Sequence, residues 1–301
     1  MRNILLKKLN EANNNFLFMV GDVGYRVIEE FKSNHPEKFL NTGVNEQFMA
    51  SFAAGVSKTM PCFIYSIANF STLRCLEQIR NDICLHDAPV CIVSVGGGFG
   101  YGALGASHHN LEDIACLGSL PNMQVFNPSS ALEVSSCVDH FFSKKKPTYL
   151  RLSSLNKECE VDSGKGQKVS VFTNNFIYND NNKILILSSG ALISTIRNEI
   201  LSLKLENKVN LSSVCCLSNE TLDHINFKEY SHIYSFEELV YSGSISSLIY
   251  KYLFDEKLNI NFSAFNVDDY SEIPGGNAEF YREKYNMSIS RINEFLKKIT
   301  S

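Results

Sequence analysis

Several features are scarce or missing in this sequence. Its 301 residues include no tryptophan and only 7 prolines, and 28 lysines and arginines stand against 32 aspartates and glutamates, for a formal net charge of −4. That balance provides no electrostatic footprint for nucleic acid or for an anionic membrane surface. No apolar run approaches the roughly 20 residues that span a bilayer, and the N-terminal apolar run is too short for a signal peptide. We therefore expect a cytoplasmic protein that binds neither nucleic acid nor membranes.

Paired cysteine motifs are also missing. The nine cysteines show no CxxC spacing; Cys215 and Cys216 are adjacent, and the others are scattered through apolar runs. Adjacent cysteines rarely bridge, and scattered ones are typical of buried thiols in a reducing compartment. The pattern therefore predicts neither a structural zinc site nor a disulfide framework.

The remaining composition is that of a globular chain, with 44% hydrophobic and 20% charged residues. Short apolar runs alternate with longer helical patterns, which predicts an α/β fold of mainly parallel sheets flanked by helices. In the first half, strands are expected at 16–21, 39–43, 61–66, 89–95, 123–128 and 148–153. Helices are expected near 24–33, 45–58, 70–86, 110–117 and 129–142.

The density of this pattern falls in one stretch, residues 156–175, which is rich in Gly, Lys and Asp. We interpret it as a linker between a first domain, residues 1–155, and a second, residues 176–301. The second half opens with a strand, a Ser-Gly turn and an amphipathic helix, which again indicates an α/β unit. A final helix is expected from the segment SISRINEFLKKIT.

One acid stands out in the stretch NTGVNEQFMASFAAG, residues 41–55. Glu46 shares a helical face with Ala50 and Ala53, among small and apolar residues. An ionised carboxylate away from water needs a partner or a function. The pattern alone leaves two interpretations open: a functional buried acid, or a solvent-facing glutamate on a half-exposed helix.

A glycine-rich segment, VGGGFGYGALGASHH, contains GYGALG, a formal match to the dinucleotide-binding pattern GxGxxG. That pattern should turn directly from strand to helix, with an acid about 20 residues further on. Here the first glycine of the match, Gly100, lies five positions after Val95, and the next strand ends in Asn127. Both departures disfavour nicotinamide or flavin binding.

The same loop ends in a histidine pair, His108 and His109. A glycine loop beyond the C-terminal end of a strand is well placed for ligand contact. An isolated histidine pair is more often structural. Zinc bound by His108, His109 and Asp113 is a further alternative, although adjacent histidines do not normally converge on one metal.

Five segments together resemble the pyrimidine-binding domain of transketolases and 1-deoxyxylulose-5-phosphate synthases, in both order and spacing. The second half is similar to the C-terminal domain of the same enzymes, so the resemblance covers nearly the whole chain and implies their two-domain fold. The segments are GVNEQ (43–47), ASFAAG (50–55), RCLEQIRNDI (74–83), GASHHNLEDIA (105–115) and LPNMQVFNPSS (120–130).

The resemblance implies thiamine diphosphate chemistry. In that family the glutamate of the GxxEQ motif, here Glu46, hydrogen-bonds the aminopyrimidine ring and promotes its imino tautomer. His108 matches the histidine that follows the family's glycine loop and assists proton transfer, so Glu46 and His108 are the catalytic candidates. The implied cofactor contacts are Glu46, Tyr65, Phe70 and Arg74, and the implied substrate contacts are His108, His109 and Arg151.

The resemblance also implies a partner. Full-length relatives carry a diphosphate-binding domain with a GDG motif and a downstream Asn that hold Mg²⁺, and the nearest string here is GDVG at 21–24. We therefore expect a split enzyme, in which a diphosphate-binding transketolase N-terminal subunit holds most of the Mg²⁺ coordination. The implied function is the pyrimidine-binding subunit of a transketolase-type transferase that moves a two-carbon ketol unit between sugars. By analogy with homodimeric relatives, we expect an α2β2 heterotetramer in which this chain also self-dimerises.

Three departures from the family bear on the substrate. Leu104 stands where transketolases have an Asp that contacts sugar hydroxyls, Gly96 replaces a phosphate-binding His, and Ser154 stands near a common phosphate-binding Arg. Arg151 is a candidate replacement, and a modified or nucleotide-linked sugar remains an alternative to a ketose phosphate. Two other functions also stay open: the beta subunit of a 2-oxo-acid dehydrogenase or decarboxylase, and a non-catalytic assembly subunit.

Overall fold

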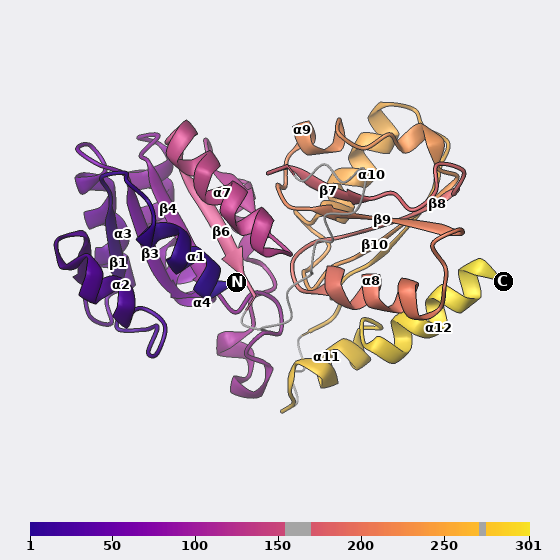
Figure 1. Ribbon diagram of the computed structural model, residues 1–301, viewed down its shortest axis with the longest axis horizontal. Coiled ribbons are helices and arrows are strands. Elements are labelled where there is room, and N and C mark those ends of the chain that lie inside the picture. Colours follow the sequence, from indigo (N-terminus) through magenta and orange to yellow (C-terminus); the bar gives the residue numbers. More distant parts are fainter. Residues whose placement is uncertain (154–169, 271–274) are drawn as a thin grey trace.

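The computed structural model describes residues 1–153, 170–270 and 275–301. They form two α/β domains, each built on its own sheet (Figure 1). The first sheet has six strands in the order β2-β1-β3-β4-β6-β5, and every neighbouring pair is parallel. The strands are β1 (Leu17–Val20), β2 (Phe39–Asn41), β3 (Cys62–Ile67), β4 (Val90–Val95), β5 (Gln124–Phe126) and β6 (Thr148–Leu152). All six predicted strands of the first half are confirmed.

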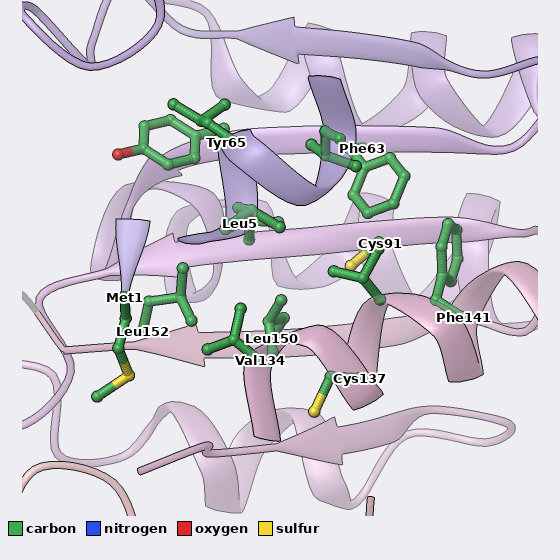
Figure 2. Close-up of a cluster of buried hydrophobic side chains, with 14 of the residues drawn as sticks. Met1, Leu5, Phe63, Tyr65, Cys91, Val134, Cys137, Phe141, Leu150 and Leu152 are labelled. Carbon is green, nitrogen blue, oxygen red and sulfur yellow. The ribbon is translucent and has the colours of Figure 1, made fainter. Parts of the chain in front are cut away.

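Helices cover both faces of this sheet. On one face, α1 (Arg2–Asn10) and α7 (Ala131–Lys144) pack over a cluster that includes Leu5, Phe63, Phe141 and Leu150 (Figure 2). On the other face, α3 (Glu46–Val56) and α6 (Asp113–Gly118) pack against alternate residues of the same strands, such as Ile64. Two-sided burial explains the nearly continuous apolar strands.

Three helical segments differ from the sequence-based expectation. Helix α1 was not predicted. Helix α2 (Glu29–Asn34) begins five residues later than expected, because Gly24 and Arg26 adopt positive φ angles of 94° and 62°. The helix expected at 70–86 is instead divided into α4 (Ala68–Ser71), a 3₁₀ turn (Leu73–Cys75), α5 (Leu76–Gln78) and a π-helical segment (Ile79–Cys84). The Thr72 hydroxyl donates to the Ala68 carbonyl at 2.6 Å, a side-chain bond that competes with regular helix.

The second sheet has five strands in the order β11-β10-β8-β9-β7, all parallel except the edge strand β7. Its strands are β7 (Thr173–Phe176), β8 (Ile184–Ser188), β9 (Val209–Val214), β10 (His232–Phe236) and β11 (Asn261–Phe265). Its helices are α8 (Leu192–Ser202), α9 (Asn219–Leu222), α10 (Ile245–Asp255), α11 (Ala278–Lys284) and α12 (Ile289–Thr300), the last of which confirms the predicted final helix. Most of the predicted linker lies outside the described residues, and its last three residues belong to β7.

The two domains are joined by main-chain hydrogen bonds. The outer edge of β5 pairs with the segment after β9. The Asn127 amide donates to the Cys215 carbonyl at 2.8 Å, and the Leu217 amide donates to the Val125 carbonyl at 2.9 Å. The thiols of Cys137, in α7, and Cys215 lie 3.5 Å apart across the same seam. The first sheet therefore continues into the second domain through backbone contacts.

The prediction of buried thiols is confirmed for the described cysteines. Of these eight, all but Cys116 are buried, and Cys116 is partly exposed. Among the described residues, no three His, Cys, Asp or Glu side chains gather closely enough to hold a metal ion. The helices of the same residues include none with the length and hydropathy of a membrane span.

Candidate active site

The candidate site lies at the C-terminal edge of the first sheet. Because β2, β1, β3 and β4 are consecutive parallel strands, the segments that follow them emerge at one edge. The segment after β2 leads to Glu46, the segment after β3 carries Phe70 and Arg74, and the segment after β4 carries His108. The topology thus collects residues from three distant parts of the sequence.

Glu46 is the first residue of α3 and is only 2% exposed. Its carboxylate accepts a hydrogen bond from the Ser66 hydroxyl, at the end of β3, at 3.3 Å, and pairs with the Arg74 guanidinium at 3.3 Å. The start of a helix also favours a negative charge. The interpretation of Glu46 as a solvent-facing residue is therefore wrong, since this acid is buried and partnered.

Phe70 connects the acid to His108. The Arg74 guanidinium carbon lies 4.5 Å from the Phe70 ring centroid, and the His108 ring lies 5.2 Å from it in an edge-to-face arrangement. Arg74 is 48% exposed, and Phe70 and His108 are half-buried. A planar cation with N–H donors thus touches both the Phe70 ring and the Glu46 carboxylate. A flat heteroaromatic ring that carries N–H groups has the chemistry to make both contacts.

His109 faces a different environment from His108. It is 4% exposed, and its Nε2 donates to the Gly102 carbonyl at 3.1 Å. Its ring packs against Tyr281 of α11, with centroids 4.6 Å apart. Asn69 donates to the His109 main-chain carbonyl and so holds this end of the loop. The zinc alternative is wrong for this geometry, since His109 is committed to main chain and aromatic contacts.

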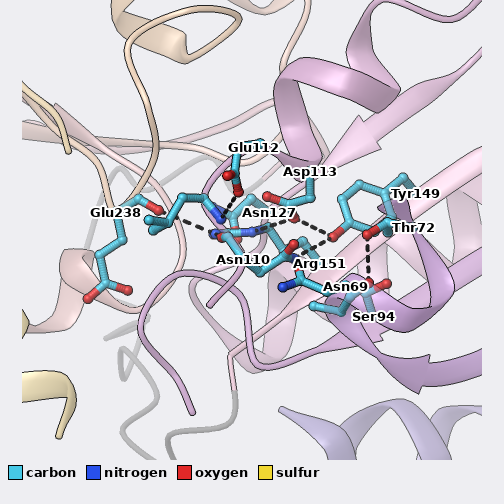
Figure 3. Close-up of polar contacts among 12 residues, drawn as sticks. Asn69, Thr72, Ser94, Asn110, Glu112, Asp113, Asn127, Tyr149, Arg151 and Glu238 are labelled. Atoms are coloured by element: carbon cyan, nitrogen blue, oxygen red, sulfur yellow. Dashed lines mark hydrogen bonds and ion pairs between the residues drawn. The ribbon is translucent and has the colours of Figure 1, made fainter. Parts of the chain in front are cut away.

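Arg151 lies beneath the loop at the domain boundary and is 5% exposed (Figure 3). Its Nε is 2.9 Å from an Asp113 carboxylate oxygen, and Nη2 donates to the carbonyls of Asn110, at 2.8 Å, and Glu238, at 3.4 Å. The Tyr149 hydroxyl donates to the same Asp113 oxygen. This geometry favours a structural role for Arg151 over contact with substrate.

Burial and neighbouring charges together set the pKa values in this network. Burial acts to lower the pKa of Arg151, but the nearby Asp113, Tyr149 and Glu238 outweigh it and raise that pKa. Burial, reinforced by Asp113, raises the pKa of Tyr149 well above its usual value. The network therefore keeps a charged arginine locked in the seam between the domains.

Tyr65 lies on the opposite face of the sheet from Glu46. Strand alternation turns its ring toward the same face of the sheet as Leu5 of α1 (Figure 2). There it contacts Phe18 at a centroid distance of 5.9 Å. Burial raises its pKa to about 12. The structure thus gathers Glu46, Phe70, Arg74 and His108, and it places Tyr65, His109 and Arg151 apart from them.

Sequence reasoning did not single out Ser66 or Asn69. Ser66 bonds the buried acid, and Asn69 fastens the glycine loop. The available signal was positional, because both polar residues follow a buried apolar run at the point where a parallel strand ends.

Together, the fold and the site define a two-domain parallel α/β protein with a buried acid at the C-terminal edge of its first sheet. Residues 3–158 match the family model described as transketolase, pyrimidine binding domain, which is more than half of the chain. The chain belongs to this family.

Individual relatives agree with this assignment. The chain is 25% identical over 282 residues to a 1-deoxy-D-xylulose-5-phosphate synthase from Clostridium botulinum (strain Alaska E43 / Type E3), covering 90% of this chain and 44% of the synthase. It is 24% identical over 281 residues to an apulose-4-phosphate transketolase subunit from Actinobacillus succinogenes, covering 88% of this chain and 86% of that relative. The chain therefore spans less than half of the synthase but most of the transketolase subunit.

A solved structure shares the whole fold. It is described as a split gene transketolase, inactive beta4 tetramer, and superposes with a TM-score of 0.80 over 99% of this chain and 97% of its own, at 23% identity. The transketolase of Campylobacter jejuni superposes with a TM-score of 0.76 at 17% identity and is matched over 46% of its length. These likenesses confirm the predicted fold class.

Proposed function

We propose that this chain is the pyrimidine-binding subunit of a heteromeric, thiamine diphosphate-dependent transketolase-type enzyme. In this proposal it works with a diphosphate-binding subunit that holds most of the Mg²⁺ coordination, and together they transfer a two-carbon ketol unit between sugars. The observation that carries the proposal is the row Glu46, Arg74, Phe70 and His108 at the edge of the first sheet.

The residues present fit the pyrimidine half of the cofactor. A buried carboxylate beside an aromatic face suits a flat ring with N–H donors, and the guanidinium of Arg74 already makes that pair of contacts. Arg74 is half exposed and so has room to move aside. When bound, thiamine diphosphate supplies an electron sink for carbon–carbon bond cleavage.

Each side chain then has a distinct role. Glu46 holds the ring by a hydrogen bond at its buried carboxyl, while Ser66 keeps that carboxyl oriented. Phe70 excludes water from one side of the site. His108 exchanges a proton at its imidazole with the reacting sugar, and its half-buried position leaves the ring accessible for that step.

An exposed apolar strip beside the acid supports a partner chain. Val44, just before α3, is 75% exposed, and Phe48 and Phe52 on the same helix are 48% and 37% exposed. The two phenylalanine rings stack at 5.3 Å. Apolar surface of this kind marks an interaction site, and the relative from A. succinogenes is itself named as a subunit. We propose that another polypeptide covers this strip in an α2β2 assembly.

The glycine loop bears on the substrate. A Cβ at Gly96 would lie 2.1 Å from the Tyr101 ring, so a phosphate-binding histidine has no room there. Leu104 is 57% exposed at the loop surface. The Arg151 guanidinium donates to Asp113 and to the Asn110 carbonyl within the domain seam. We propose a sugar substrate whose recognition depends less on phosphate contacts from this chain than in the family's pentose phosphate enzymes.

The test is Glu46→Gln in the reconstituted complex. Co-expression with the diphosphate-binding partner, followed by a mass-spectrometric screen of ketose donors and aldose acceptors, defines the activity. Glu46→Gln should then lose at least about 100-fold in turnover while the complex still assembles by size-exclusion chromatography. Glu77→Gln, an exposed acid on α5, is the matched control. Wild-type rates for Glu46→Gln, or activity of the isolated chain with thiamine diphosphate and Mg²⁺, would contradict the proposal.

A further inference from the structure

The glycine loop, residues 96–109, is closed at its base by main-chain hydrogen bonds. The Gly98 amide donates to the Asn110 carbonyl at 2.9 Å, and the Asn110 amide donates to the Gly98 carbonyl at 3.1 Å. Gly98 has a φ angle of 66°, and a Cβ there would lie 2.3 Å from a carboxylate oxygen of Glu238 in the second domain. The base of the loop is therefore in direct contact with the C-terminal domain.

The tip of the loop rests on helix α11, which lies beside it in Figure 1. A Cβ at Gly102 would lie 2.7 Å from the Ala278 nitrogen, so the two main chains approach as closely as glycine allows. The Phe99 ring stacks on Tyr281 with a centroid distance of 4.9 Å and an interplanar angle of 11°. The His109 ring meets the same tyrosine at 4.6 Å and 76°. Tyr281 thus touches both arms of the loop.

Helix α11 is itself fixed to the domain. Arg282 forms a buried ion pair with Glu238, the residue that also borders Gly98. The charge of Glu238 raises the pKa of Arg282. Asn277 caps the helix by accepting a hydrogen bond from the Phe280 amide at 2.9 Å. The tyrosine that meets the loop is therefore carried on an anchored element.

The adjacent histidines face opposite ways. His109 turns toward Tyr281 and donates from Nε2 to the Gly102 carbonyl, whereas His108 turns toward Phe70, in the candidate site. One peptide unit joins them, so any rotation of the chain at His109 also moves the imidazole of His108. His109 is 4% exposed, so contacts with the protein, and not with water, fix its side chain.

From these contacts we propose that α11 positions the glycine loop, with Tyr281 and His109 as positioning residues that hold His108 toward Phe70. The link to catalysis rests on the proposed function, in which His108 transfers a proton; the mechanical link between α11 and the loop does not. The second domain thereby acts on the site of the first without contributing a side chain to it.

Hydrogen exchange measured by mass spectrometry on the whole isolated chain tests the mechanical link. Tyr281→Leu removes the ring that meets both arms of the loop, and we expect amides of residues 99–109 to exchange at least about tenfold faster. Strand amides of both sheets should exchange as in wild type. Phe254→Leu, which changes a ring on α10 that is 76% exposed, is the control and should leave the loop unchanged. Unchanged loop exchange in Tyr281→Leu, or an equal rise in the strands of the second domain, would overturn the proposal.

Kinetics in the reconstituted complex test the link to His108. With the donor and acceptor found by the mass-spectrometric screen, Tyr281→Leu should lower kcat about tenfold, with the acceptor KM within about twofold of wild type. Tyr281→Phe keeps the ring and should restore kcat. An active complex in which Tyr281→Leu keeps its kcat would overturn the positioning role. An inactive wild-type complex would instead count against the proposed function, and the exchange result on the isolated chain would be unaffected.

Discussion

Replacing Arg151 by methionine should destabilise the protein strongly. Methionine keeps most of the arginine volume but lacks the N–H donors that reach Asp113 and the carbonyls of Asn110 and Glu238. Asp113 is 0% exposed, so its carboxylate is left in the seam with Tyr149 as its remaining donor. Breaking a buried ion pair by removing one partner costs about 3–5 kcal/mol, which is a large part of the about 5–15 kcal/mol that stabilises a typical domain.

Urea unfolding gives the magnitude. The chain has no tryptophan and 13 tyrosines, so circular dichroism and tyrosine fluorescence are the probes. A second variant, Asp113→Asn combined with Arg151→Met, removes the unpaired charge and should recover at least half of the loss, and the double-mutant cycle isolates the coupling. Arg291→Met, which breaks an exposed pair with Glu283, is the control and should show no resolvable change. A stability within about 1 kcal/mol of wild type for Arg151→Met would refute the structural role given to this residue.

Two further predictions concern other buried features. Burial raises the pKa of Glu133 in spite of hydrogen bonds from Ser129, so the folded state favours the protonated acid. The stability that this protonated carboxyl contributes is therefore lost as pH rises through the folded pKa. Glu133→Gln should therefore gain stability relative to wild type from about pH 4 to about pH 8 in urea titrations, and a constant difference would contradict this assignment. Gly102→Ala should cost about 1–3 kcal/mol, because the new methyl group meets the main chain of Ala278 at 2.7 Å. Gly118→Ala, with open space around it, should be neutral or stabilising in the same assay, and equal losses in both would argue against the close approach.

Periodicity predicted the sheet well for a physical reason. Strands covered on both faces are almost continuously apolar, and that signal is local in the sequence, so all six strands of the first half were found. The helix expected at 70–86 breaks because the Thr72 hydroxyl bonds back to the main chain, and propensity does not register such a bond. Helix α1 was not predicted, because the burial of Leu5, Leu6 and Leu9 depends on packing against α7, which is distant in the sequence.

The site was harder to predict, because its geometry depends on contacts between distant residues. The helical pattern around Glu46 left its burial undecided, and only the motif match favoured a functional acid. Adjacency in sequence says nothing about which way His108 and His109 point, since positive φ angles at Gly98 and Gly105 set the path of the loop. The sequence could not show that Arg151 is paired with Asp113, 38 positions away, and therefore left it as a candidate for substrate binding.

The main-chain pairing between β5 and residues 215–217 affects how the protein can be divided. Removal of the second domain would leave the Asn127 amide and the Val125 carbonyl without their partners and would expose a sheet edge that the whole chain keeps covered. Such an edge is a template for aggregation. A chain nicked between the domains, by contrast, would retain both halves of this pairing. The domain that carries the candidate site is thus separable in sequence but depends on its neighbour to cover this edge.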